Sequence, residues 1–414
     1  LINARWWEHN YGKVSVFWIC ITLVTMLLAR PRDVSFAHLF GGAIIHTSAE
    51  YVFFIILLGS LFVVTGGIVI RGSLSGRPVT NLAILGVGTL LASFIGTTGA
   101  AMLLIRPLIK SIRWRQHRTH VIIFFIFLVC NIGGSLTPIG DPPLFIGFLR
   151  GVPFHWTFAL TPMWAMASGL LLGLFYLLDT FLMKRETGIP PDMEQKGIRI
   201  EGLANIALLL GIVGTVLFSG LVKMGEIDFG LATLQGQNFV SAGIMVGLAL
   251  ASLAFTPRAF REENNFNFAP IIEVALLFVG IFATMIPALM VLNARGAELG
   301  VDSASKFFWA TGTLSSFLDN TPTYMSFLET ACGMLGMTVA QLLQSPQGTL
   351  FLKAISVGAV FMGANTYIGN GPNFMVKAIA EQEKIRMPSF FGYMAWSVSI
   401  LVPVFILVDV VFFL

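Results

Sequence analysis

The chain alternates long apolar stretches with short polar segments. Because a membrane-spanning helix needs about 20 consecutive apolar residues, this pattern predicts an all-α polytopic membrane protein with about nine transmembrane helices. The predicted spans are 14–29, 50–70, 121–148, 157–183, 203–222, 238–257, 270–292, 349–378 and 390–413.

Two further apolar segments, 79–107 and 303–331, have polar centres. The first contains Gly-Thr-Thr-Gly at 96–99, and the second contains Asp-Asn-Thr-Pro at 319–322. Such centres would expose unsatisfied backbone groups if they faced lipid, whereas a hairpin packed inside the protein can satisfy them. We therefore expect two re-entrant hairpins, each of which enters and leaves on one side of the membrane.

The sequence also contains a repeat. LASFIGTTGAAM at 91–102 matches LSSFLDNTPTYM, which begins 223 residues later at 314. GSLTPIGDPPLFIG at 134–147 matches GANTYIGNGPNFMV at 363–376 in the same order. The acids do not repeat, because Asp141 corresponds to Asn370, and Asp319 corresponds to Gly96.

Composition and charge place this repeat in a membrane. The chain is 56% hydrophobic and 11% charged, against roughly 25% charged residues in soluble domains. With the N-terminus inside and both hairpins non-crossing, most of the 25 basic residues fall in inner segments, as the positive-inside rule requires. The basic residues therefore indicate topology, and nucleic acid is not an expected partner.

This layout makes the two copies run in opposite directions across the membrane. We expect a first inverted repeat at 1–183, a linking helix within 184–237 and a second repeat at 238–414. Inverted repeats with interrupted helices are typical of secondary transporters, in which the site lies near the membrane midplane between the repeats.

Two predicted spans cannot be regular helices. TPIGDPP at 137–143 interrupts span 121–148, and TYIGNGP at 366–372 interrupts span 349–378, because proline removes a backbone donor and glycine loosens the chain. Each span should become two half-helices, whose ends and free carbonyls can bind a small ion.

A carboxylate inside a membrane is costly, and it usually pairs with a cation or carries a proton. Asp141 and Asp319 are therefore the principal candidates, with Na+ hypothesised at both. If each hairpin forms a site with its own broken helix, each of two sites holds one acid. The candidate ion and proton site comprises Asp141, Asp319, Asn320, Thr321, Thr97, Thr98, Thr137, Gly140, Asn365, Thr366 and Asn370.

Five residues are possible accessories to this site. Glu50 and Glu273 correspond in the two copies and lie at the predicted starts of two spans, where an acid also favours the helix dipole. Asn131, Thr323 and Asn373 lie beside the interruptions. The transported or coupling ions should be Na+ and protons, with no further cofactor and no enzymatic activity.

The motifs at these interruptions resemble those of the ion transporter superfamily. NIGGSLTPIGDPP at 131–143 and SFLDNTPT at 316–323 are similar to the paired motifs of arsenite pumps and, most closely, D-type sodium/proton antiporters. Citrate transporters also carry the first motif. The resemblance implies a homodimer with a scaffold and a moving transport domain, elevator-like alternating access, and Asp141, Asp319 and Asn320 near the ion.

The hairpin tips depart from one branch of that superfamily. Symporters of sodium and divalent anions carry Ser-Asn-Thr at both tips, whereas this chain has Gly-Thr-Thr at 96–98 and Asp-Asn-Thr at 319–321. A sodium/proton antiporter is thus the first hypothesis, and a sodium- or proton-coupled citrate or dicarboxylate transporter is the second. A channel and an intramembrane aspartyl protease are weaker alternatives, since the protease motif requires glycine where Pro138 stands.

We expect the protein in the lipid bilayer of a bacterial cytoplasmic (inner) membrane. The predicted topology has the N-terminus inside and the C-terminus outside.

Overall fold

The computed structural model describes residues 4–31, 33–72, 74–187 and 199–414. The described chain is mostly helical, as the apolar pattern predicts. Its α-helices are α1 Ala4–Ala29, α2 Phe36–Thr65, α3 Pro78–Ile95, α4 Thr97–Ser111, α5 Thr119–Leu128, α6 Pro142–Leu149, α7 Thr161–Met183, α8 Leu203–Leu221, α9 Gly236–Phe255, α10 Arg258–Glu263, α11 Ala269–Arg295, α12 Ala304–Ser315, α13 Asn320–Leu335, α14 Val339–Gln344, α15 Pro346–Met362, α16 Gly371–Gln382 and α17 Phe390–Phe412.

Within the described residues, nine helical segments are long and apolar enough to cross a membrane. The chain is therefore an integral membrane protein, although the nine segments are not the nine predicted ones. The hairpin arm Pro78–Ile95 qualifies by length, whereas predicted span 121–148 is divided into α5, a short 3₁₀ helix at Ile132–Ser135 and α6. The glycine and proline residues of its motif explain this division.

Helix α2 starts well before the predicted boundary at residue 50. The Ser35 hydroxyl accepts a hydrogen bond from the His38 amide at 3.2 Å and caps the helix at Phe36. Glu50 consequently lies in the middle of a 30-residue helix. The prediction that Glu50 opens its span is wrong, because serine provides the cap and the apolar pattern continues before Glu50.

Two small antiparallel sheets lie outside the long helices. Strand β1 Val69–Arg71 pairs with β2 Arg199–Glu201, and β3 Glu226–Asp228 pairs with β4 Thr233–Gln235. The sequence prediction lacked both sheets, since strands of three residues give no useful hydrophobic period.

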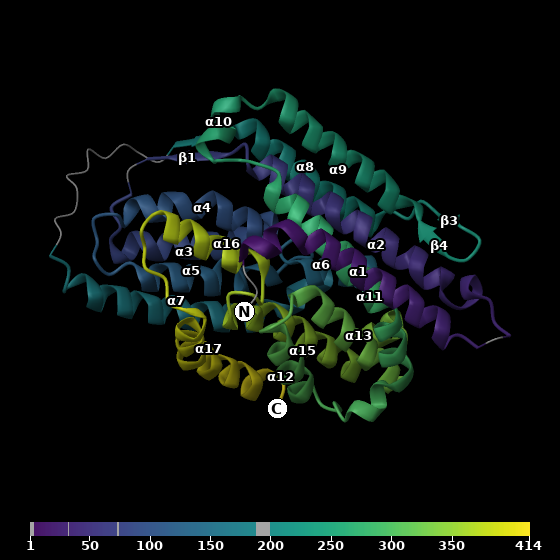
Figure 1. The fold of residues 1–414 in the computed structure, drawn as a ribbon. Coiled ribbons are helices and arrows are strands. Elements are labelled where there is room, and N and C mark those ends of the chain that lie inside the picture. Colours follow the sequence, from purple (N-terminus) through teal and green to yellow (C-terminus); the bar gives the residue numbers. More distant parts are fainter. Residues whose placement is uncertain (1–3, 32, 73, 188–198) are drawn as a thin grey trace.

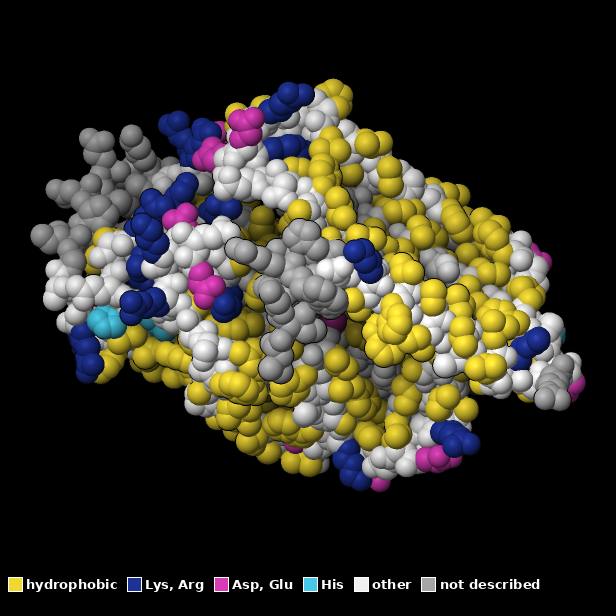
Figure 2. All heavy atoms as spheres, in the orientation of Figure 1, with side chains coloured by type: hydrophobic (Ala, Val, Ile, Leu, Met, Phe, Trp, Pro, Cys, Tyr) yellow, Lys and Arg dark blue, Asp and Glu magenta, His cyan; other side chains and the backbone are white. Residues whose placement is uncertain are grey.

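The helices form two groups that pack against each other (Figure 1). In the first group, α2 packs against α8, α9 and α11, and α1 packs against α11. The second group contains α3–α7 and α12–α17, including both hairpins and both broken helices. Figure 2 shows a broad hydrophobic band beside an end of the molecule where many Lys and Arg side chains gather.

A charged contact joins the first sheet to α10. Arg71 donates to Glu263 Oε2 at 2.7 Å and to Glu201 Oε1 at 3.0 Å. The hydrogen bond from Arg71 holds the pKa of Glu263 below its ordinary value of 4.5. The stabilisation of the fold by the Arg71–Glu263 contact is therefore fully present above pH 4.5. It is lost as the pH falls through the lower pKa that Glu263 has in the folded protein.

We expect Glu263→Gln to lower the melting temperature slightly at neutral pH, and the difference from wild type to shrink below pH 4.5. Thermal unfolding in detergent across this pH range measures the effect, with Glu262→Gln on the same helix as the control. A difference that stays constant with pH would contradict the assignment.

Candidate functional site

The first hairpin and the first broken helix are joined by direct hydrogen bonds. Helices α3 and α4 meet at Gly96, whose φ of 79° favours glycine. The amide of the next residue, Thr97, donates to Gly140 O at 2.9 Å. The Thr137 hydroxyl donates to Ser93 O and accepts from the Ile139 amide at 3.2 Å. The hairpin tip thus holds the unwound segment in place.

The second hairpin and broken helix repeat this arrangement. The Thr366 hydroxyl, which corresponds to Thr137, donates to Ser316 O at 2.5 Å and accepts from the Ile368 amide at 3.2 Å. The Ser316 hydroxyl donates to Met362 O at 3.1 Å, and the corresponding Ser93 hydroxyl donates to Gly133 O. The paired motifs therefore share their local hydrogen bonding. The repeat boundaries and their inverted orientation stay predictions.

Asp141 lies where the two hairpins and two broken helices meet. It immediately precedes α6, and only 1% of its surface is exposed. Its carboxylate accepts from Thr97 Oγ1 at 3.1 Å, Asn320 Nδ2 at 2.9 Å and Asn370 Nδ2 at 3.3 Å. Thr97 and Asn320 occupy corresponding positions in the two tips, and Asn370 corresponds to Asp141 itself. The two repeats thus converge on one carboxylate.

The donors to Asp141 are all electrically neutral. None of the ion pairs among the described residues includes Asp141. A buried carboxylate is stable only when it is paired with a cation, stabilised by hydrogen bonds or protonated. Three neutral donors help to hold the charge, and a small cation or a proton would neutralise it.

Asp319 has a different environment. It is partly buried and caps α13, because its Oδ1 accepts from the Thr321 amide at 3.0 Å. The Thr323 hydroxyl donates to Asp319 O at 3.0 Å. The expectation of two sites, each confined to one repeat, does not match this geometry: Asn320 and Asn370 of the second repeat both contact Asp141 of the first.

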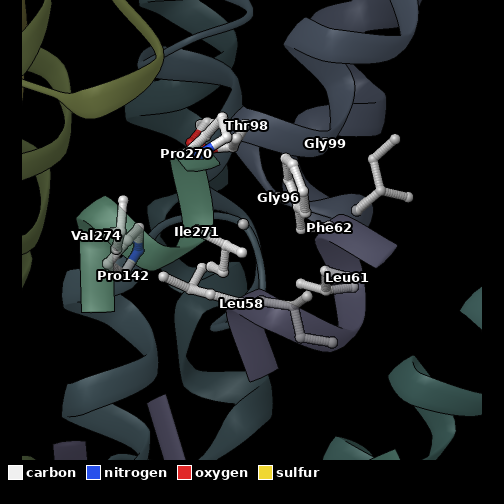
Figure 3. Close-up of a pocket in the computed structure, with 14 residues that line it drawn as sticks. Leu58, Leu61, Phe62, Gly96, Thr98, Gly99, Pro142, Pro270, Ile271 and Val274 are labelled. Atoms are coloured by element: carbon white, nitrogen blue, oxygen red, sulfur yellow. The ribbon is translucent and has the colours of Figure 1, made fainter. Parts of the chain in front are cut away.

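A cavity lies beside the first hairpin tip, between the two helix groups (Figure 3). Thr98 and Gly140 border it, and side chains from α2 and the start of α11 form the opposite wall. The cavity volume of about 70 Å³ exceeds the roughly 10–15 Å³ that a cavity needs to hold one water molecule. The cavity therefore has room for a small ion and water beside the peptide units that flank Asp141.

Asparagine side chains connect the two broken helices. Asn131 Nδ2 donates to Asn373 Oδ1 at 2.8 Å and to Ile126 O at 2.8 Å. Asn373 Nδ2 in turn donates to backbone oxygens at Gly363 and Thr366 at 2.9 and 3.0 Å. These accessory candidates thus tie together the unwound segments near Asp141.

The remaining candidates lie at different distances from this centre. Asn365 Nδ2 donates to Ser316 Oγ at 2.9 Å, so it supports the second tip. Glu50 pairs instead with Arg150, with Nε and Oε1 2.9 Å apart. Glu273 lies partly buried near the start of α11.

Sequence reasoning missed Ser315, Arg150 and Glu329. Ser315 belongs to the repeated tip sequence but lacks a charge, and it was therefore overlooked. Glu329 lies in an apolar hairpin arm, where an acid by itself indicates a function or a buried partner. That signal was present in the sequence.

The side chains around Asp141 carry carboxylate, amide and hydroxyl oxygens, although the amides of Asn320 and Asn370 here turn their NH₂ groups toward the carboxylate. Such oxygens suit hard cations, whereas transition metals favour imidazole and thiolate ligands. The described residues contain no cluster of three His, Cys, Asp or Glu side chains that could hold a metal ion.

Comparison with known proteins adds a family-level finding. A family profile described as putative citrate transport matches residues 1–413. None of the curated proteins matches the chain.

Proposed function

Given that the chain belongs to the family described as putative citrate transport, we propose that it is a secondary transporter in which Na+ and protons compete for Asp141. Na+ entering from one side would displace a proton, and a proton entering from the other side would displace Na+. In this proposal, the Asp141 carboxylate carries the charge, while both hairpin tips and both broken helices contribute oxygen atoms or orient them.

The observation that carries this proposal is a shortage of hydrogen-bond donors beside Asp141. The Ser315 hydroxyl has one proton, yet its oxygen lies 2.6 Å from Asn320 Oδ1 and 2.7 Å from Ala359 O. The Ser315 hydroxyl can donate to only one of these two oxygens at a time, so the other receives no hydrogen bond from it. Asn131 Oδ1 is also buried, and it has no hydrogen-bond partner among the described residues.

Two of these oxygens, on Asn320 and Asn131, lie close to Gly363. A methyl group on Gly363 would lie 2.3 Å from Asn320 Oδ1 and 3.0 Å from Asn131 Oδ1. Neither amide can simply turn round, because Asn320 Nδ2 donates to Asp141, and Asn131 Nδ2 makes two hydrogen bonds of its own. A cation among these oxygens would satisfy acceptors that the protein leaves short of donors.

Sodium-driven proton movement tests the proposal. In proteoliposomes with a pH-sensitive dye inside, an inward Na+ gradient should drive protons out, and a K+ gradient of equal size should have a smaller effect. Protein-free vesicles are the control. Absence of any sodium-driven proton movement under these conditions would reject cation/proton exchange.

Coupled citrate transport is a second candidate, and the family match favours it. The cavity beside the first tip has no Lys or Arg among the residues that line it, so a carboxylate substrate would need bound cations to offset its charges. Two results together would favour this candidate over exchange. Citrate uptake would depend on Na+ or protons, and Na+ would drive no proton movement when citrate is absent.

We further propose an arrangement in which the first helix group is a scaffold and the second group moves relative to it. We also propose a homodimer, as the resemblance of the motifs implies, in a bacterial cytoplasmic membrane. An orientation with the N-terminus inside and the C-terminus outside agrees with the basic residues in the predicted inner segments. Labelling of single cysteines introduced at each end, in intact cells, tests the orientation.

A further inference from the structure

A partly buried charged cluster joins the two helix groups away from Asp141. Arg150, directly after α6, donates through Nε and Nη2 to Glu50 at 2.9 and 3.1 Å. Its Nη1 donates to Glu329 Oε1 at 2.5 Å, and Asn293 Nδ2 donates to Glu329 Oε2 at 2.7 Å. The exposed fractions of the Arg150, Glu50 and Glu329 side chains are only 15%, 13% and 19%.

The cluster crosses the boundary between the groups. Glu50 on α2 and Asn293 on α11 belong to the first group, whereas Arg150 and Glu329 belong to elements that surround Asp141. Any displacement of the second group along α2 and α11 must separate Arg150 from Glu50 and Glu329 from Asn293. Intact contacts therefore mark one position of the second group.

The repeat places a complementary pair in the other half of the molecule. At the offset of 223 residues that aligns the hairpins, Glu50 corresponds to Glu273 on α11, and Glu329 corresponds to Arg106 on α4. In the first set, two acids need a bridging cation, which Arg150 supplies. In the second set, an acid and an arginine can pair directly. At the offset of 229 residues that aligns the two broken helices, the position corresponding to Arg150 is the apolar Ile379.

Arg106 lies near a different partner in this structure. With the Asn265 amide oriented so that its oxygen faces the guanidinium, Arg106 donates to that oxygen at 3.0 and 3.1 Å. Asn265 precedes α11, which begins at Ala269, and Glu273 lies further along the same helix. Sliding α4 along α11 would thus carry Arg106 from Asn265 toward Glu273.

We propose that these are alternating closures: the Glu50–Arg150–Glu329 cluster holds the position described here, and an Arg106–Glu273 ion pair holds the opposite one. The inference rests on the proposed transport function, since it assumes that the second helix group moves. It assigns a structural role to five charged residues outside the Asp141 site.

Cross-linking tests the two closures directly in membranes. In a background with Cys20, Cys130 and Cys332 replaced by alanine, the pairs Glu50→Cys/Arg150→Cys and Arg106→Cys/Glu273→Cys should each react with a short bifunctional thiol reagent. With all four cysteines present, cross-linking one pair first should prevent cross-linking of the other. The pair Glu50→Cys/Arg106→Cys is the control and should not cross-link.

Charge reversal provides a second test. Arg106→Glu and Glu273→Arg should each lower exchange about tenfold, and the double variant should recover to within about twofold of wild type, as expected for contacting residues. The control, Arg106→Glu combined with Glu50→Arg, should not recover. Each variant is compared at equal amounts of correctly eluting protein.

The outcomes separate this inference from the proposed function. Sodium-driven exchange without an Arg106–Glu273 cross-link and without charge-reversal rescue overturns the alternating closures alone. Mutually exclusive cross-links in a protein that shows no sodium-driven proton movement support the closures and reject cation/proton exchange. Simultaneous cross-linking of both pairs in one molecule overturns the inference, because the two contacts would then coexist.

Discussion

Asp141→Asn should reduce sodium-driven proton flux to the leak rate of protein-free vesicles. The substitution keeps the size of the side chain and removes the charge that both ions are proposed to share. Asn320 donates to one carboxylate oxygen and Asn370 to the other, so the NH₂ group of the new asparagine must face one of these two donors. A buried donor left without an acceptor costs about 1–3 kcal/mol, so the local geometry should loosen as well.

Asp319→Asn should have a smaller effect. Asp319 is only partly buried and caps α13 through the Thr321 amide, and asparagine is an equally good N-cap residue. We expect slower exchange with a weaker apparent affinity for Na+, because a charge beside Asn320 is lost while the tip keeps its shape.

The two variants are compared in the same proteoliposome assay, with Asp302→Asn as a control at an exposed position. Size-exclusion profiles and melting temperatures check that each protein is folded. Wild-type exchange in folded Asp141→Asn would refute the site assignment. If Asp319→Asn abolished exchange while Asp141→Asn remained active, the principal ion-binding carboxylate would be Asp319 at the second hairpin tip.

Gly140→Ala should destabilise the protein strongly. A methyl group at Gly140 would lie 2.1 Å from Gly134 O and 2.9 Å from Ser93 Cα. Both neighbours are backbone atoms, which cannot rotate away as a side chain can. The unwound segment would have to separate from the first hairpin, which would also strain the hydrogen bond from the Thr97 amide to Gly140 O. Overpacking of this kind costs about 1–3 kcal/mol, and sometimes more.

Thermal unfolding in detergent measures this cost as a lower melting temperature. Gly369→Ala, at the corresponding position of the second repeat, should act similarly, because its methyl group would lie 2.5 Å from Gly363 O. Gly169→Ala on α7 is the matched control, since a methyl group there meets no atom within 4 Å. Equal melting temperatures for Gly140→Ala and Gly169→Ala would contradict the close approach of hairpin and broken helix.

The boundaries of the helices show where local sequence is informative. The predicted interruptions at 137–143 and 366–372 coincide with breaks between helices, and only their last two residues belong to the following helices α6 and α16. Proline and glycine act on the backbone where they stand. The start of α2 was misplaced, since a single serine cap decides it. Strands β1 and β2 are more than a hundred residues apart in the sequence, and no local pattern predicts that they pair.

The candidate site divides in the same way. Asp141 could be selected from sequence because a carboxylate in an apolar span is costly wherever it points. Its partners could not be assigned, because Asn320 lies 179 residues away and Asn370 lies 229 residues away. Arg150 follows the predicted span 121–148, and only the structure shows it partly buried between Glu50 and Glu329.

The amino-acid pattern alone identifies this chain as a helical membrane protein with a repeated pair of motifs, two interrupted spans and an acid in one of them. Hydrophobic runs, proline, glycine and an isolated charge each have consequences that do not depend on their neighbours in space. The folded structure was needed to show that both repeats donate hydrogen bonds to one carboxylate. Those contacts join distant residues, and the packing of the four interrupted elements determines which side chains meet.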